Sequence, residues 1–159
     1  MFFVILGSQK FQFNRLLREI DRLIENRIIT DKVFAQIGYS DYSPQFYDYK
    51  KFLNHEEFVE TIEKADLVIT HGGTGAIVGA VKKGKKVIAV PRLARYGEHI
   101  DDHQIQIVEQ FAELDLLCAC QDCTELGTVL QEIRNISFKK YESNTKAIIE
   151  SIKEYIDSI

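Results

Sequence analysis

Two glycine-containing turns carry the residue types that could bind a phosphate group. The first, Gly7-Ser8-Gln9, follows the apolar run Phe2–Leu6, and the second, His71 to Gly75, follows the apolar run Leu67–Thr70. Glycine backbone offers unhindered N–H groups, and a helix that starts after such a turn adds a partial positive charge. The predicted phosphate-binding residues are therefore Gly7, Ser8, Gln9, Gly72, Gly73, Thr74 and Gly75.

A third polar segment, residues 91–104, follows the apolar run Val87–Val90 and reads PRLARYGEHIDDHQ. Arg92 or Arg95 could add positive charge beside a phosphate, and Asp102 and Gln104 could bind sugar hydroxyl groups. His103 could face the donor or only the solvent. Asp101 or Asp102 could equally be a helix cap. His99 lies in a loop that could close over a ligand.

His71 is the best placed candidate for chemistry, because it ends a predicted strand immediately before the glycines. We predict His71 and Asp102 as catalytic residues. The alternative for His71 is a structural one, in which its ring bonds to backbone and shapes the turn.

The elements that must position these residues alternate between strands and helices. Such alternation predicts an α/β fold with a doubly wound, mostly parallel, Rossmann-like sheet, in a single domain over residues 1–159. In that topology the first and fourth strands are neighbours at the switch point, so both glycine turns open at one edge. The expected strands are Phe2–Leu6, Val33–Gly38, Phe46–Phe52, Leu67–Thr70, Val87–Val90 and Leu116–Cys120. Helices are expected from Asn14 (as a cap), from Asn54 or His55, from the second glycine turn to Lys83, from Asp101 or Asp102, near 124–133 and over about 144–158.

Composition narrows the class of protein. The net charge of −4 argues against nucleic acid as the main ligand, and no run approaches the roughly 18 apolar residues that span a bilayer. Three cysteines, Cys118, Cys120 and Cys123, are too few for a disulfide framework, which favours a cytoplasmic location. They also fall short of the four ligands of structural zinc, so we predict no metal site.

A dinucleotide-binding alternative stays open, because Gly73-x-Gly75-x-x-x-Gly79 is close to the Rossmann fingerprint. However, three strands precede this turn, and Arg92 stands where an acidic residue normally binds the ribose. An NADP-dependent oxidoreductase is therefore a secondary hypothesis.

The motifs taken together resemble a known family. THGGTG at 70–75, the Val87–Pro91 strand, DDHQ at 101–104 and GSQKFQFNRL at 7–16 are similar to the donor-binding half of GT-B glycosyltransferases, in the family 28 C-terminal domain. The chain resembles polysaccharide glycosyltransferase subunits of the PssE/EpsF type, and the catalytic subunit of the split eukaryotic UDP-GlcNAc transferase.

This resemblance implies a UDP-sugar as donor substrate, no separate cofactor, and inverting transfer to a lipid-linked acceptor in polysaccharide synthesis. It also implies a membrane-associated partner that binds the acceptor, so that the chain is peripheral at the inner face of the membrane. Many relatives hold the ribose with a glutamate where this chain has Gly79. A non-catalytic auxiliary subunit is the alternative.

The predicted final helix, residues 144–158, is a candidate docking surface. Its apolar stripe could pack on the sheet, on the partner or on a second copy of the chain. The stripe consists of Ile148, Ile152, Tyr155 and Ile159.

Overall fold

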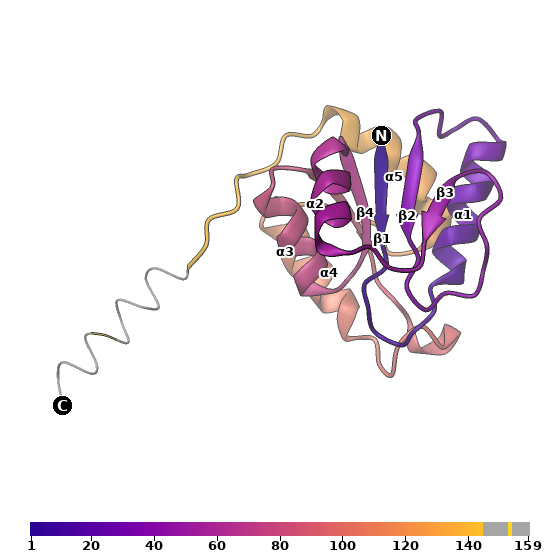
Figure 1. Cartoon of the computed structure of the whole chain (residues 1–159). Helices are drawn as coiled ribbons and strands as arrows, with labels where there is room; N and C mark the ends of the chain where they lie inside the picture. Colours follow the sequence, from indigo (N-terminus) through magenta and orange to yellow (C-terminus); the bar gives the residue numbers. More distant parts are fainter. Residues whose placement is uncertain (145–152, 154–159) are drawn as a thin grey trace.

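A computed structural model describes residues 1–144 and 153, and in these residues a six-stranded sheet forms the centre of the molecule (Figure 1). Every paired strand is parallel to its neighbour, and the order is β3-β2-β1-β4-β5-β6. This is the Rossmann order, with its switch point between β1 and β4. The doubly wound fold is confirmed, and the strands are β1 Phe2–Ile5, β2 Val33–Gln36, β3 Asp48–Lys50, β4 Leu67–His71, β5 Lys86–Val90 and β6 Cys118–Ala119.

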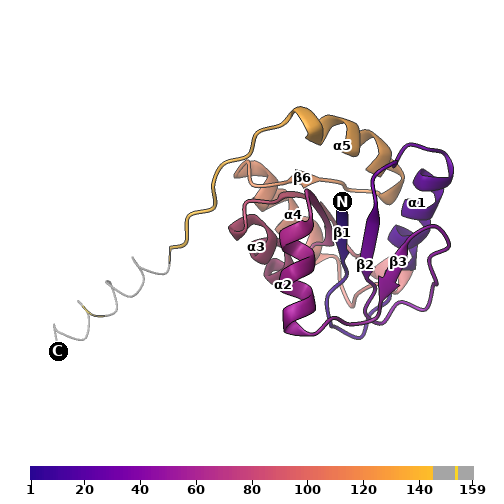
Figure 2. The ribbon, with the colours of Figure 1, turned by 45° about the horizontal axis from the view of Figure 1, so that its top comes forward.

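Helices cover both faces of the sheet. Figures 1 and 2 show α2, α3 and α4 together on one side, and α1 and α5 on the other. The two buried clusters of apolar side chains follow this division. The helices are α1 Asn14–Glu25, α2 His55–Lys64, α3 Thr74–Lys82, α4 His103–Glu113 and α5 Leu126–Glu132.

The central strand β1 shows why its sequence is apolar without interruption. Phe2 and Val4 enter the core under α1 and α5, whereas Phe3 and Ile5 enter the core under α2, α3 and α4. A strand that is covered on both faces needs apolar side chains at every position.

Helix starts agree with the predictions at α2 but not at α1. Asn54 caps α2 through a capping box with Glu57, as its position predicts. At α1 the cap position is Phe13, so the prediction of Asn14 as cap was wrong. The Asn14 side chain instead joins the Asp41 carboxylate and the Tyr42 N–H, which fastens the start of α1 to the loop after β2.

The two edge strands are shorter than predicted. The expected strand Phe46–Phe52 reduces to β3, and Leu116–Cys120 reduces to β6, because an edge strand is paired on one side only. Cys118 and Cys120 pack towards the same core cluster, as free thiols. Burial raises the pKa of the Cys120 thiol to about 12, so this thiol is unreactive.

The predicted final helix lies outside the described residues, apart from Asn144 and Lys153. Its apolar stripe therefore stays a prediction. In residues 1–144 no helix has the length and apolar character needed to cross a membrane.

Candidate functional site

The turns after β1 and β4 meet at the carboxyl edge of the sheet and form one cavity, as the switch-point topology predicts. Its volume is about 390 Å³. The lining residues are Gly7, Ser8, Gln9, His71, Gly73, Thr74, Gly75, Ala76, His99, His103, Gln104 and Ile107. The sequence-predicted residues among them come from three separate segments, the turn after β1, the turn after β4 and the start of α4, and the fold brings them together.

The imidazole of His71 lies between the two glycine turns. A Cβ at Gly7 would stand 2.8 Å from His71 Cε1, and a Cβ at Gly73 would stand 2.3 Å from His71 Nε2. Gly7 also has φ +72°, a conformation that side chains other than glycine rarely adopt. Both glycines are therefore required by the approach of backbone to the His71 ring.

Hydrogen bonding assigns the tautomer of His71. Its Nδ1 lies 3.3 Å from the Ile5 carbonyl oxygen, which can only accept a hydrogen bond. Nδ1 therefore carries the proton, which leaves the Nε2 lone pair between the glycine turns. His71 therefore bonds to backbone through Nδ1, as the structural interpretation predicts. Its Nε2 makes no such bond and can still take part in chemistry.

The electrostatic surroundings keep His71 neutral. Burial, together with the positive charge of the nearby Arg92 guanidinium, lowers the pKa of His71 to about 4. Neutral His71 at pH 7 can accept a proton or a hydrogen bond at Nε2. A bound anion would raise this pKa towards neutrality.

The first turn of α3 is suited to an anion. Gly73 occupies the cap position and provides no side-chain hydrogen bond to the helix start. The N–H groups at the start of α3 therefore have no side-chain acceptor, their residues line the cavity, and the helix dipole adds a partial positive charge there. Thr74 and Gly75 are exposed at this helix start.

Gln104 is buried and fastens the turn after β4 to the end of β5. Its Oε1 accepts hydrogen bonds from Gly72 N at 3.0 Å and Arg92 N at 3.1 Å. Gly72 leaves room for this contact, because a Cβ there would stand 2.8 Å from Gln104 Cβ. Gly72 thus acts by packing and does not line the cavity, whereas Gln104 does.

Besides Gly72, two predicted site residues, Arg92 and Asp102, do not line the cavity. Arg92 is only 1% exposed, and its Nη2 donates to the Leu6 carbonyl at 2.6 Å, so it lies beneath the site. Asp102 is exposed, and its carboxylate accepts the Ala94 N–H at 2.8 Å. Direct donor contact by Arg92 is therefore not supported, and Asp102 stabilises the loop that precedes α4.

Sequence reasoning missed the anchor of that loop. Glu98 is fully buried and accepts two hydrogen bonds from Arg15 of α1, each 3.0 Å long, and a third from Leu93 N. This bidentate pair holds His99 over the cavity against the ring of Phe11. Arg15 and Glu98 are 83 positions apart, so no local pattern could have revealed the pair.

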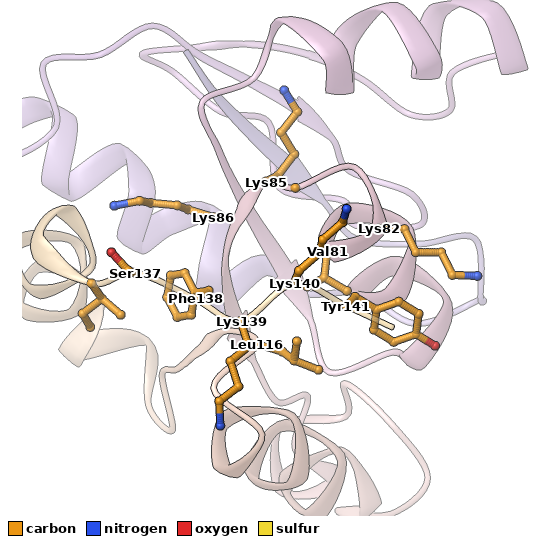
Figure 3. Close-up of a pocket in the computed structure, with 12 residues that line it drawn as sticks. Val81, Lys82, Lys85, Lys86, Leu116, Ser137, Phe138, Lys139, Lys140 and Tyr141 are labelled. Atoms are coloured by element: carbon orange, nitrogen blue, oxygen red, sulfur yellow. The ribbon is translucent and has the colours of Figure 1, made fainter. Parts of the chain in front are cut away.

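A second cavity of about 410 Å³ lies between α3, β5 and residues 136–141. Five lysines line it, but Figure 3 shows the side chains of Lys82, Lys85, Lys86 and Lys139 pointing in different directions. Lys85 and Lys86 donate to backbone carbonyls, and Lys139 pairs with Asp115 at 2.8 Å. These cations do not converge on a ligand, so the cavity at the glycine turns is the better candidate site.

Alanine substitutions at Gly73 and Gly79 should distinguish the effect of close packing against His71 from the effect of helix propensity on stability. We expect Gly73→Ala to lower the free energy of unfolding by about 1–3 kcal/mol, because its Cβ displaces the His71 ring. Gly79→Ala, also in α3 but with open space around it, should raise that free energy by about 0.5–1 kcal/mol. Urea unfolding measures both, and equal effects would contradict the close contact with His71.

The depressed pKa of His71 predicts a pH dependence of stability. As pH falls from 6.5 towards 4, the unfolded chain binds a proton at this residue and the native state does not, so stability falls. The loss attributable to His71 is on the order of 3 kcal/mol by pH 4. Urea unfolding at pH 7 and pH 4.5 should show a smaller loss for His71→Gln than for the native chain. His55→Gln, at an exposed histidine, should retain the native loss, and equal losses in all three proteins would refute the assignment.

Known proteins resemble this chain in both sequence and fold. The human UDP-N-acetylglucosamine transferase subunit ALG13 is 26% identical over 110 residues, which cover 68% of this chain and 9% of the human protein. The Kluyveromyces lactis protein of the same name is 38% identical over 74 residues, covering 43% of this chain and 36% of that protein. Among solved structures, Acinetobacter baumannii MurG superposes with a TM-score of 0.56 at 18% identity, over 82% of this chain and 41% of MurG.

A glycotransferase of kitacinnamycin superposes with a TM-score of 0.59 at 15% identity, over 86% of this chain and 35% of that structure. The two structural superpositions support the fold. The chain spans less than half the length of each of these four proteins. The model of the glycosyltransferase family 28 C-terminal domain matches residues 1–159. The chain therefore belongs to the glycosyltransferase family 28 C-terminal domain family.

Proposed function

We propose that this domain binds a UDP-sugar and, with a membrane-associated partner, transfers the sugar with inversion to a lipid-linked acceptor in polysaccharide synthesis. The observation that carries the proposal is the cavity at the switch point. There the first turn of α3, the Gly7–Gln9 turn and neutral His71 face one space. N–H groups and a helix dipole stabilise the negative charge that develops on a departing diphosphate.

The lining suggests how the donor is oriented. The diphosphate lies at the start of α3 and against Ser8 and Gln9, while His103 and Gln104 face the ribose or the sugar. Gly79 has open space around it and offers no side chain to the ribose. Hydroxyl binding then falls to these polar residues of α4.

The need for a partner is supported by the form of the site, which is an open cavity at one edge of the sheet. Its relatives are named as UDP-N-acetylglucosamine transferase subunits. We therefore place the acceptor on a second, membrane-associated chain, with this domain peripheral on the cytoplasmic side.

Donor binding is testable on the chain by itself. Calorimetric titration should give saturable binding of UDP and of UDP-GlcNAc, and Ser8→Asp should weaken UDP binding at least 10-fold, because its charge opposes the diphosphate. Ser43→Asp, an exposed position outside the cavity, should leave the affinity unchanged. Binding of NADPH with no response to UDP would overturn the proposal in favour of an oxidoreductase.

One observation favours the auxiliary alternative. A histidine with a pKa of about 4 is a weak general base at pH 7 unless the donor diphosphate raises that pKa. If His71 is catalytic, His71→Ala should lower kcat by about 10²-fold or more in the chain reconstituted with its partner and a lipid-linked acceptor. Asp102→Ala, which affects the loop and not the cavity lining, serves as the comparison. Unchanged turnover of a folded His71→Ala variant would support the auxiliary role.

A further inference from the structure

The edge of the sheet at β3 carries a set of exposed residues that the proposed function does not use. Among the described residues β3 pairs with β2 alone, and Figure 2 shows it as the outermost strand on that side. Four of the nine exposed large apolar side chains in this part of the chain lie within residues 39–52, and they are Tyr39, Phe46, Tyr49 and Phe52. Exposed aromatic side chains beside an unpaired strand edge are typical of a surface that another chain covers.

The backbone of β3 turns the polar groups of Tyr49 to this free edge. The Lys50 carbonyl oxygen accepts the Ile37 N–H at 2.9 Å, so the backbone groups of Lys50 face β2. Backbone direction alternates along a strand, so the N–H and C=O of Tyr49 point away from β2. No loop or turn within residues 1–144 bonds to either group through its backbone. One donor and one acceptor are therefore ready to pair with another strand.

The sequence around Tyr49 is complementary to itself when two copies run antiparallel. The segment that contains β3 reads FYDYKKF, and an antiparallel pair centred on Tyr49 puts Asp48 of each copy opposite Lys50 of the other. The same register puts Phe46 opposite Phe52, and it lets the two Tyr49 residues exchange both N–H···O=C bonds. A parallel pair in register would instead place like charges opposite each other, which is unfavourable.

The loop before β3 is held in a fixed shape by α1. The buried Asp21 carboxylate accepts the backbone N–H groups of Gln45 at 2.8 Å and of Phe46 at 3.0 Å. It also accepts the Tyr42 hydroxyl at 2.7 Å. Phe46 is thus fastened through its backbone while it is 52% exposed. A surface that is already ordered loses little conformational freedom when a second chain covers it.

We propose that two copies of this chain associate through β3, in an antiparallel pair centred on Tyr49 that joins their sheets into one. Lys50 pairs with Glu57 of α2 at 2.6 Å, which holds its ammonium group on the face of the sheet that Asp48 shares. The strands of the two copies run in opposite directions, so the two cavities open at opposite edges of the joined sheet. No residue of this surface lines the cavity at the glycine turns, and the inference is therefore independent of the proposed function.

Charge reversal tests both the association and its register. Sedimentation velocity of the native chain should show a monomer–dimer equilibrium that depends on concentration. Asp48→Lys and Lys50→Asp each place like charges across the pair, so each should weaken the dimer at least about 10-fold. An equimolar mixture of these two variants should associate again, because every charged pair across that heterodimer is opposite in sign. Lys140→Asp, at an exposed lysine beside α3, is the matched control and should dimerise as the native chain does.

Circular dichroism checks that each variant is folded before its association is compared. A native chain that stays monomeric at every concentration would overturn the inference. A dimer of equal affinity in all the variants would also overturn it, because the contact would then lie elsewhere, as on the predicted final helix. If the two reversed variants remain monomeric when they are mixed, the antiparallel register is wrong.

Discussion

The approach of the His71 ring to backbone on both sides is the constraint on which the site depends. β1 and β4 are hydrogen-bonded neighbours, so their carboxyl ends deliver the Gly7 turn and the Gly73 turn to opposite sides of one imidazole. Gly38 extends this arrangement, because a Cβ there would stand 2.7 Å from the Gly7 carbonyl oxygen. Three turns thus pack through backbone, and that packing brings N–H groups to the cavity surface without intervening side chains.

The other wall of the cavity is fixed by buried polar contacts and not by apolar packing. The Arg15–Glu98 pair joins α1 to the loop after β5, and Gln104 joins that loop to the turn after β4. Removal of one partner of a buried pair leaves an uncompensated charge, which is far more costly than loss of a surface pair. A loop held in this way keeps a defined shape, and it presents His99 and the start of α4 to the cavity.

A buried positive charge, the Arg92 guanidinium, lies beneath the site. The Arg92 guanidinium is buried under the turns, donates to the Leu6 carbonyl and lies over the Phe13 ring. Burial lowers the pKa of Arg92 to about 10, so it remains protonated at pH 7. It therefore acts on the cavity at a distance, since its charge lowers the pKa of His71 and adds positive potential where we place the diphosphate.

The sequence by itself determined the order of strands and helices, the parallel sheet and the two glycine turns. Hydrophobic periodicity and turn residues are local signals, and they depend on neighbours within a few positions. It also located most of the cavity lining, because carboxyl ends of parallel strands share one edge whatever the side chains are. A helix was predicted to start at Asn54 or His55, and the structure confirms this start with Asn54 as the cap of α2.

Only the tertiary structure decided which side chains face the ligand. Arg92 and Asp102 have polar side chains in the predicted loop, yet Arg92 turns inward to the Leu6 carbonyl and Asp102 turns to Ala94 N. His99, whose role the sequence left open, is brought beside Asp101 and His103 by the distant Arg15–Glu98 pair. The direction of a side chain depends on partners far away in the sequence, and those partners exist only once the chain has folded.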